Sequence, residues 1–385
     1  MVGPSFYARA AGKCASGRRG SHLVAGQSAI RILSYPILIE PAGIDRLGSI
    51  VAEHAPAHRY AIITDSNVGP IYGSRALNSF PPGSVELLTF AAGEENKNRE
   101  SWNRLTDNLL GLGFGRDTTV VALGGGVVGD LAGFVAATFM RGVQFVQVPT
   151  SLLAMIDASI GGKTGVDTPA GKNLVGVFHN PTTVFIDPQT LGTLPLNNLR
   201  TGFAEAIKHG AIADSGYFEF VKRELPLLLA PDNNAGDLLS RVIVRSIEIK
   251  AGIVVRDERE RGLRKVLNFG HTIGHALESL SGYELAHGEA VAIGMALESA
   301  IAERAGVADA GTSAAIRDAL SAANLPADRP QAISGEKILD SMRADKKARG
   351  GRVEYALPRC IGAMAGSESG WAVAVDEDIV REVLT

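Results

Sequence analysis

Three of the eight histidines in the chain fall close together, at His271, His275 and His287. His271 and His275 are four residues apart, so on a helix their side chains would lie on one face. Zinc binds imidazole nitrogen and carboxylate oxygen, and catalytic zinc sites use three protein ligands and keep positions open for substrate. Glu205 is a candidate oxygen ligand from another helix. We therefore interpret this group as a metal site.

Glycines surround these histidines, at Gly270, Gly274 and Gly288. A glycine inside a helix costs roughly 1 kcal/mol relative to alanine. Glycines at this place therefore suggest the close approach of a ligand or of another helix. The alternative is that the histidines are ordinary surface or core residues, which is the usual fate of any single one. Their concentration favours the metal site.

A second pattern is the run Gly124-Gly125-Gly126-Val-Val-Gly-Asp130, between a continuous apolar segment and a predicted helix. Glycines let the backbone approach a pyrophosphate, and N–H groups at a helix start stabilise its charge. The spacing is not G-x-G-x-x-G with an acidic residue ~20 positions later. By itself, the run fits a tight strand-to-helix turn without ligand as well as it fits a nucleotide site.

Two predicted loops combine glycine with lysine, in GGKTGV at 161–166 and GKN at 171–173. Such loops bind phosphate through backbone N–H and ammonium groups. The spacing of an ATP-binding P-loop fails in both, because Asp157 and Val166 stand where glycine is required. Polar residues on the predicted helices of the second half are usually exposed to solvent. Four of these residues could nevertheless line an anion site together with Lys163 and Lys172, namely Lys208, Lys250, Arg264 and Asn268.

Length and composition restrict the class of protein. A chain of 385 residues corresponds to two domains at ~100–200 residues each. The net charge of -3 gives no reason to expect nucleic acid or an anionic membrane as partner. Two cysteines, Cys14 and Cys360, fit a reducing cytoplasm, and no apolar run approaches the ~20 residues of a membrane span. We interpret residues 1–28 as a disordered extension or an early start codon rather than a targeting segment.

The spacing of apolar residues predicts an α/β half followed by a mainly helical half. Ordered structure is expected from about Ser34. Strands are predicted at 35–40, 60–64, 85–90, 118–123, 143–148 and 183–186, and helices at 44–54, 99–112 and from 128. Further helices are predicted at 199–212, 235–256, 270–281, 287–304, 312–323 and 335–343, with a loop-rich region at 305–335. We therefore predict a Rossmann-like α/β domain over 29–192 and an α-helical domain over 193–385, with the ligand in the cleft between them.

Taken in order, several segments resemble the 3-dehydroquinate synthase family of the sugar phosphate cyclases. The matching segments are LGGGVVGDLAGFVAATFMRG, VPTSLLAMIDASIGGKTGVDTPAGKNLVG, TGFAEAIKHG, LRKVLNFGHTIGHALES and LAHGEAVAIGM, with GEENK near residue 95 and DKK at 345–347. The resemblance extends from about Ser34 to the C-terminus and leaves out the N-terminal extension. The number, order and spacing of the motifs make it specific.

The resemblance implies an NAD-binding α/β domain, a helical metal-binding domain, Zn²⁺ or Co²⁺ as metal, and a cytoplasmic homodimer. It implies that Glu205, His271 and His287 bind the metal, with His275 as a substrate or proton-transfer residue beside it. Other active-site positions of the family are matched by Asp157, Lys163, Lys172, Asn173, Lys208, Lys250, Arg264 and Asn268. Arg141 matches an arginine that reaches the substrate phosphate from the neighbouring subunit, and one of Lys346 and Lys347 matches another phosphate-site lysine.

The family's nucleotide-contacting positions are matched by Asp65, Asn67, Glu94, Lys97, Gly125, Gly126, Asp130 and Thr150, and less clearly by Thr190 and Thr193. Lys163 and Lys172 are expected near the cofactor as well as the substrate. Two departures are visible. Ser151 replaces the usual second threonine after Pro149 and keeps a hydroxyl, and Asp167 stands where asparagine is common and adds a charge near the substrate loop.

The implied reaction converts 3-deoxy-D-arabino-heptulosonate 7-phosphate, an anionic sugar phosphate, into 3-dehydroquinate and phosphate in the shikimate pathway of aromatic amino acid biosynthesis. Transient oxidation by NAD precedes phosphate elimination, re-reduction and intramolecular aldol closure. The alternatives are another cyclase (an amino-dehydroquinate, valiolone or deoxy-inosose synthase), a metal-dependent polyol dehydrogenase, and an inactive NAD-binding protein. The segments DASIGGKTGVD and NFGHTIGHA favour the dehydroquinate branch.

Overall fold

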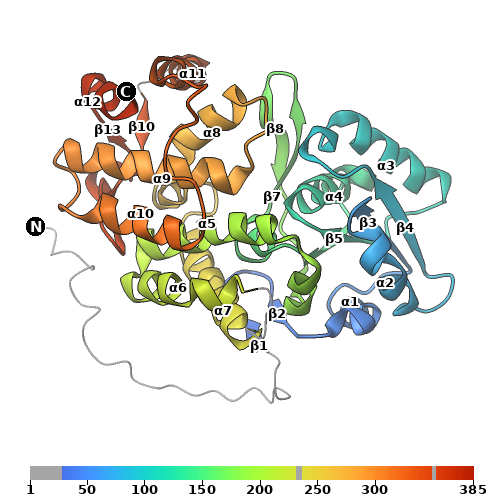
Figure 1. Cartoon of the computed structure of the whole chain (residues 1–385). Coiled ribbons are helices and arrows are strands. Elements are labelled where there is room, and N and C mark those ends of the chain that lie inside the picture. Colours follow the sequence, from blue (N-terminus) through green and yellow to red (C-terminus); the bar gives the residue numbers. More distant parts are fainter. Residues whose placement is uncertain (1–27, 231–235, 349–352) are drawn as a thin grey trace, which may run out of the picture.

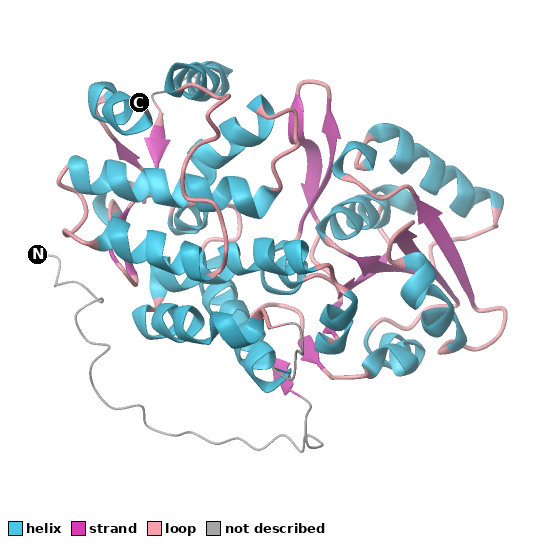
Figure 2. Ribbon diagram, viewed as in Figure 1, coloured by secondary structure: helices cyan, strands magenta, loops and turns pink. Residues whose placement is uncertain are grey.

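The computed structural model describes residues 28–230, 236–348 and 353–385, with only the backbone for 345–348. The predicted extension at 1–28 lies outside these residues, except for Ser28. The described chain forms an α/β part and a helical part, which lie side by side in Figure 1. Figure 2 shows that the strands gather in the first part and that helices dominate the second, as the sequence predicts.

The α/β part contains a seven-stranded sheet in the order β1-β2-β9-β6-β5-β3-β4. Its neighbouring strands are parallel except for β1 and β2. Every residue of β5 is buried, as expected for a continuous apolar strand in a sheet covered on both faces. The strands are β1 Ser28–Ile30, β2 Ile37–Ile39, β3 Arg59–Asp65, β4 Val85–Phe90, β5 Thr118–Gly124, β6 Gln144–Pro149 and β9 Thr183–Ile186.

Helices cover both faces of the sheet because alternate strand residues point to opposite sides. Val121 of β5 belongs to the apolar cluster under α1 and α2, whereas Val120 and Ala122 belong to the cluster under α3 and α4. The helices are α1 Leu47–His54, α2 Ser74–Asn78, α3 Arg99–Gly111 and α4 Gly126–Thr138. Short helical turns complete the part: η2 Gly43–Arg46, η3 Gly69–Gly73, η4 Glu94–Asn96, η5 Phe139–Arg141, η6 Ala154–Ala158 and η7 Pro188–Thr193.

The strand order changes direction between β3 and β5, because β4 follows on one side of β3 and β5 on the other. In open parallel sheets, ligands bind beyond the carboxyl ends of the strands at such a switch point. The glycine run after β5 and Asp65 at the end of β3 therefore flank the expected ligand position.

The segments at 161–166 and 171–173 were predicted as loops, and this prediction is wrong except at Gly161 and Gly162. The other residues belong to a hairpin of β7 Lys163–Thr168 and β8 Gly171–Phe178. The glycines and lysines make the strand pattern hard to recognise in the sequence. In the hairpin, Val166 pairs with Val175. Val166 is fully buried in the cluster that contains α4 residues, which holds the hairpin against the α/β part. Figure 1 shows the hairpin standing between α4 and α8.

The second part is mainly helical. Its central helix is α9, which is buried along most of its length and packs against α5, α8 and α10. The helices are α5 Leu196–Ala213, α6 Ser215–Leu228, α7 Gly236–Val254, η8 Leu263–Asn268, α8 His271–Leu280, α9 His287–Arg304, α10 Thr312–Ala322, α11 Gly335–Ala348, η9 Ser367–Ser369 and α12 Glu377–Leu384. The short strands are β10 Glu354–Tyr355, β11 Pro358–Cys360, β12 Ala363–Met364 and β13 Val373–Ala374.

Several boundaries differ from those predicted. The structure includes β1, which lies before Ser34 and pairs with β2 at the sheet edge. Helix α4 begins at Gly126 instead of residue 128. The prediction omitted α6, which contains Pro226, and the two-residue strands near the C-terminus. In the described ranges, none of the helices combines the length and hydrophobicity of a membrane span.

Candidate active site

Glu205, His271 and His287 come together from three helices. Glu205 Oε1 lies 3.7 Å from Nε2 of His271 and 3.7 Å from Nε2 of His287. Two atoms bound tetrahedrally to one zinc ion at about 2.1 Å would lie about 3.4 Å apart. Glu205 is completely buried; its Oε2 forms an ion pair with Lys208, and its Oε1 has no hydrogen-bond partner among the described residues. The geometry therefore suits a shared cation.

Both histidines are the first residues of their helices, and a buried carboxylate fixes one of these starts. Glu298 of α9 accepts hydrogen bonds from the backbone N–H groups of Gly270 at 2.7 Å and Ile273 at 3.0 Å. Gly270 adopts φ 81, in the left-handed region that favours glycine. These contacts set the position from which His271 points toward Glu205.

The glycines near the histidines are explained by helix packing rather than by a ligand. A Cβ on Gly274 would lie 3.1 Å from the carbonyl oxygen of Ala290, and a Cβ on Gly288 would lie 2.2 Å from that of Thr201. Of the two reasons considered from the sequence, the close approach of another helix is therefore the one observed. The packing brings α5, α8 and α9 close enough for Glu205, His271 and His287 to meet.

The protonation states of His271 and Glu205 suit metal binding, whereas a metal would have to displace a proton from His287. Burial alone would lower the pKa of His287, but the carboxylates of Glu205 and Glu278 raise it to about 9. Burial and the nearby Lys208 ammonium hold the pKa of His271 well below its usual value, so its imidazole is neutral. Burial alone would raise the pKa of Glu205, but its ion pair with Lys208 lowers the pKa below the usual range. An ionised carboxylate and a neutral imidazole are the forms that bind a metal ion.

His275 lies beside the cluster, as its spacing from His271 predicts. Its ring centroid is 5.2 Å from that of His271 and 6.3 Å from that of His287. Its side chain is exposed, so it is open to a substrate, while the neighbouring Glu205 and His271 are less accessible. This position suits a residue that contacts substrate beside the metal.

Asp157 and Lys250 lie next to Glu205. Lys250 Nζ is 2.7 Å from Asp157 Oδ1, and the buried His209 Nε2 is 3.5 Å from the same oxygen. Oxygens of Asp157 and Glu205 lie within 4.8 Å of each other. Burial lowers the pKa of Lys250 to about 8 despite the neighbouring carboxylate. The sequence analysis did not identify His209.

A second cation cluster forms around Glu260, another residue that the sequence analysis missed. Glu260 forms an ion pair with Lys163 and accepts a hydrogen bond from Asn268 Nδ2 at 2.6 Å. Arg264 is 2% exposed, and its Nη2 donates to the carbonyl oxygen of Gly161 at 3.3 Å. The hairpin and η8 thus bring three of the predicted anion-site residues together.

Lys172, at the start of β8, links the hairpin to the histidine cluster. Its Nζ lies 3.0 Å from Glu278 Oε1, and the same oxygen lies 3.4 Å from His287 Nδ1. Burial alone would raise the pKa of Glu278, but His287 and Lys172 lower it to about 2. The neighbouring Asn173 has φ 56 and donates its N–H to Asp167 Oδ1 at 2.8 Å.

The predicted nucleotide residues gather at the carboxyl ends of the parallel strands. Asp65 Oδ1 accepts from the N–H groups of Asn67 at 2.9 Å and Val68 at 2.8 Å, which orders the turn after β3. After β6, the Thr150 N–H donates to the carbonyl oxygen of Gly124 at 2.9 Å, and Ser151 Oγ accepts from Ala154 N–H at 3.3 Å.

Neither conformation nor packing in the chain requires glycine at position 125. Its φ is −76, and a Cβ there would have Ser151 Oγ at 3.6 Å as its nearest contact. At Gly126, a Cβ would lie 3.3 Å from Ala158 Cβ. The backbone at the start of α4 is therefore open to a ligand, which is the condition for pyrophosphate binding.

Lys97 holds three carboxylates at the edge of this region. Its Nζ pairs with Glu94 at 2.6 Å, Asp130 at 3.5 Å and Asp167 at 3.6 Å. Burial raises the pKa of Asp130 to about 6, although Lys97 opposes the shift. Asp167, the departure from the family pattern, is therefore a partner of Lys97 and of the hairpin backbone.

The remaining predicted residues are less closely joined to these clusters. Thr190 and Thr193 bond within η7 and to Tyr72, whose hydroxyl is 2.7 Å from Thr193 Oγ1. Arg141 is exposed at the end of η5, and no contact joins it to the clusters within the described residues. The side chains of Lys346 and Lys347 lie outside the described residues.

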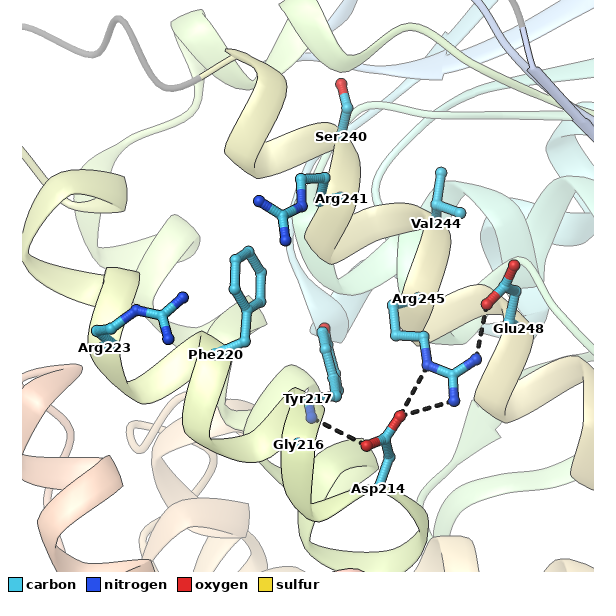
Figure 3. Close-up of a pocket in the computed structure, with 10 residues that line it drawn as sticks. All are labelled: Asp214, Gly216, Tyr217, Phe220, Arg223, Ser240, Arg241, Val244, Arg245 and Glu248. Carbon is cyan, nitrogen blue, oxygen red and sulfur yellow. Dashed lines mark hydrogen bonds and ion pairs between the residues drawn. The ribbon is translucent and has the colours of Figure 1, made fainter. Parts of the chain in front are cut away.

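A separate cavity of about 680 Å³ lies between α6 and α7 (Figure 3). Arg241 lies over the ring of Phe220, with 4.3 Å from its Cζ to the ring centroid. Arg245 is paired with Asp214 and Glu248. None of the residues that line this cavity is one of the predicted site residues.

Solved structures of similar fold bind nucleotide and metal. A 2-deoxy-scyllo-inosose synthase complexed with carbaglucose-6-phosphate, NAD⁺ and Co²⁺ is 26% identical, with a TM-score of 0.83 over 93% of this chain and 99% of that chain. A 2-epi-5-epi-valiolone synthase from Streptomyces hygroscopicus subsp. jinggangensis, with NAD⁺ and Zn²⁺ bound, is 28% identical, with a TM-score of 0.80 over 93% of this chain and 97% of that one. The fold and the site together define a sugar phosphate cyclase.

Sequence comparison identifies the branch. Residues 87–201 match the 3-dehydroquinate synthase N-terminal family, and residues 202–348 match the 3-dehydroquinate synthase C-terminal family. The 3-dehydroquinate synthase of Caldanaerobacter subterraneus subsp. tengcongensis is 43% identical over 91% of this chain and 97% of its own length, and that of Nostoc punctiforme is 42% identical over 91% and 96%. The chain belongs to the 3-dehydroquinate synthase family, whose members are lyases.

Proposed function

We propose that this chain is an NAD- and metal-dependent lyase that converts 3-deoxy-D-arabino-heptulosonate 7-phosphate into 3-dehydroquinate and phosphate. Residues 29–192 would hold the nucleotide, and residues 193–385 would hold Zn²⁺ or Co²⁺ through Glu205, His271 and His287. The observation that carries this proposal is the meeting of Glu205 Oε1, a buried oxygen without a hydrogen bond among the described residues, and two imidazole nitrogens, each 3.7 Å from it.

The described residues fit both groups. The open backbone at Gly125, at the start of α4, suits a pyrophosphate, and the chemistry of the Glu205 cluster suits a divalent ion. When bound, NAD supplies reversible hydride transfer, and the metal supplies a Lewis acid that polarises a substrate oxygen.

The cations of the chain would bind and orient the substrate. A sugar phosphate that also carries a carboxylate needs positive charge at two places, and lysine and arginine provide it. Three of these cations each form an ion pair with a carboxylate: Lys163 with Glu260, Lys172 with Glu278, and Lys250 with Asp157. These ion pairs fix the cations before substrate binds, which reduces the ordering needed during the reaction.

Two residues are suited to move protons. Lys250 Nζ, with its pKa lowered to about 8, can exchange a proton near neutral pH, and the ionised Asp157, whose Oδ1 lies 2.7 Å away, holds it in position. His275 is the exposed imidazole beside the metal ligands and would exchange protons with the substrate. The assignment of site roles to individual residues rests on this geometry and on the family pattern.

The test is a coupled assay of phosphate release. Purified protein with NAD, zinc and the heptulosonate phosphate is expected to release phosphate and form dehydroquinate, and a chelator is expected to abolish both. Phosphate release that survives complete removal of metal would contradict the metal dependence. Activity with the sugar phosphates used by other cyclases, in place of the heptulosonate, would move the protein to another branch. Net NADH accumulation with glycerol would indicate a polyol dehydrogenase.

We also infer a cytoplasmic homodimer in which Arg141 completes the partner's site. Its exposure at the end of η5 supports this role. Arg141→Ala and His271→Ala dimers should each be nearly inactive. Dimers with one subunit of each variant should regain part of the activity. In such a dimer, the site of the Arg141→Ala subunit keeps its own His271 and receives an intact Arg141 from the other subunit. Mixed samples that stay inactive after confirmed subunit exchange would contradict shared sites.

A further inference from the structure

Glu278 is a buried carboxylate that joins two parts of the site. It lies on α8 and is 2% exposed. Its Oε1 lies 3.4 Å from Nδ1 of His287 and 3.0 Å from Nζ of Lys172. The histidine begins α9, and the lysine belongs to the hairpin at β8, so one oxygen contacts side chains from two separate elements.

The two nitrogens of His287 face two different carboxylates. Nε2 points to Glu205, the proposed metal ligand, at 3.7 Å, and Nδ1 points to Glu278 at 3.4 Å. A carboxylate at Nδ1 favours the tautomer with hydrogen on that nitrogen, which leaves the lone pair of Nε2 for a metal. It also limits rotation of the ring and makes the ligand nitrogen more basic.

Lys172 keeps this carboxylate in place from the other side. Its Nζ lies 4.5 Å from the centroid of the Tyr283 ring and 3.8 Å from Glu94 Oε1. Glu94 is in turn paired with Lys97, which contacts Asp130 of α4. The contacts therefore continue from His287 through Glu278 and the hairpin to the predicted nucleotide residues.

We propose that Glu278 is a positioning residue that orients His287 for the metal and, through the same oxygen, ties Lys172 of the hairpin to the metal site. This inference rests on the proposed function, since it requires a metal at Glu205, His271 and His287. Glu278 acts on the metal through His287 rather than as a ligand, because its oxygen faces Nδ1 and the opposite nitrogen faces Glu205.

A competing arrangement makes Glu278 a ligand itself. Atoms of His275, Glu278 and His287 also lie within 4.8 Å of one another and could hold an ion. The two arrangements exclude each other at His287. With the metal on Nε2, Nδ1 remains bonded to Glu278, whereas a metal on Nδ1 would displace that bond. The two arrangements differ in what removing the Glu278 charge does to metal binding.

The experiment measures Co²⁺ binding by chelator competition and by the visible absorption of the bound ion. Glu278→Gln should lower Co²⁺ affinity by about 10–100-fold and change the absorption spectrum, because a neutral amide is a weaker acceptor for Nδ1–H. Glu278→Leu should lower it further. The matched control is Glu284→Gln, which removes an exposed carboxylate from the loop between α8 and α9 and should bind Co²⁺ as the unchanged protein does.

A third variant separates the two partners of Glu278. Lys172→Met should reduce turnover, yet leave Co²⁺ affinity within about threefold, since the bond from His287 to Glu278 remains. NAD affinity and circular dichroism establish that each variant is folded. An affinity of Glu278→Gln equal to that of Glu284→Gln would overturn the inference, and so would complete loss of Co²⁺ from Glu278→Gln. A loss in Lys172→Met as large as in Glu278→Gln would also overturn it.

The outcomes for the inference and for the proposed function are distinct. If the unchanged protein binds no Co²⁺, or if His271→Ala binds it normally, the proposed metal site is wrong. If the unchanged protein binds Co²⁺ through His271 but Glu278→Gln does so equally well, the metal site stands and only the role of Glu278 is rejected.

Discussion

Gly125→Ala should weaken NAD binding without harming the fold. The added Cβ would meet Ser151 Oγ at 3.6 Å, an ordinary van der Waals contact, and the backbone φ of −76 is open to alanine. Gly125 is the N-cap of α4, where alanine is less favourable than glycine by up to about 1 kcal/mol. The methyl group would, however, occupy the space next to the backbone where a pyrophosphate would lie.

We expect Gly125→Ala to weaken NAD binding at least tenfold, or about 1.4 kcal/mol, by isothermal titration calorimetry. The free energy of unfolding in urea should fall by no more than about 1 kcal/mol. The matched control is Gly124→Ala, in which the Cβ would lie 2.4 Å from Val128 Cγ2. That variant should lose about 1–3 kcal/mol of stability through overpacking. Unchanged NAD affinity in a folded Gly125→Ala protein would refute the placement of the pyrophosphate.

Three further predictions concern other parts of the molecule. Glu298→Ala leaves two backbone N–H groups at the start of α8 without their acceptor, so the free energy of unfolding in urea should fall by about 2–4 kcal/mol. Glu303 accepts a hydrogen bond from Ser313 N–H near the surface, so Glu303→Ala should lose less stability. Burial raises the folded-state pKa of Asp130 from 3.8 to about 6, so its stabilising contribution is present below about pH 4 and is lost as the pH rises through 6. Between these pH values, the free energy of unfolding of the unchanged protein should fall by about 1–3 kcal/mol relative to that of Asp130→Asn. Stability curves of the two proteins that run parallel with pH would contradict this. Lys163→Ala should reduce the turnover number much more than tenfold in the phosphate-release assay, whereas a near-normal rate would remove Lys163 from the site.

The clustering of the proposed metal ligands could be predicted because their types and spacing are distinctive. His271 and His275 share a helix face, and the glutamate comes from a motif that accompanies them. The sheet was also predictable, since runs such as 118–123 are apolar throughout and are typical of parallel strands covered on both faces. The structure adds that α5, α8 and α9 bring these residues within contact distance.

Other features could not be predicted because they depend on distant pairing. Glu260 becomes important only when η8 folds against the hairpin and meets Lys163. The hairpin itself was missed because glycine and lysine outweigh its β-branched residues. Glu278 had a usable signal, because it follows His271 by seven residues and His275 by three, and these spacings place all three on one helix face.

X-ray absorption at the zinc edge tests the central arrangement most directly. Purified protein should contain one zinc ion per chain, bound at about 2.0–2.2 Å by oxygen and nitrogen, with scattering from two imidazole rings. His271→Ala and His287→Ala should each remove one imidazole contribution. A zinc spectrum that is unchanged in both variants, or that shows no imidazole, would contradict the site built from Glu205, His271 and His287.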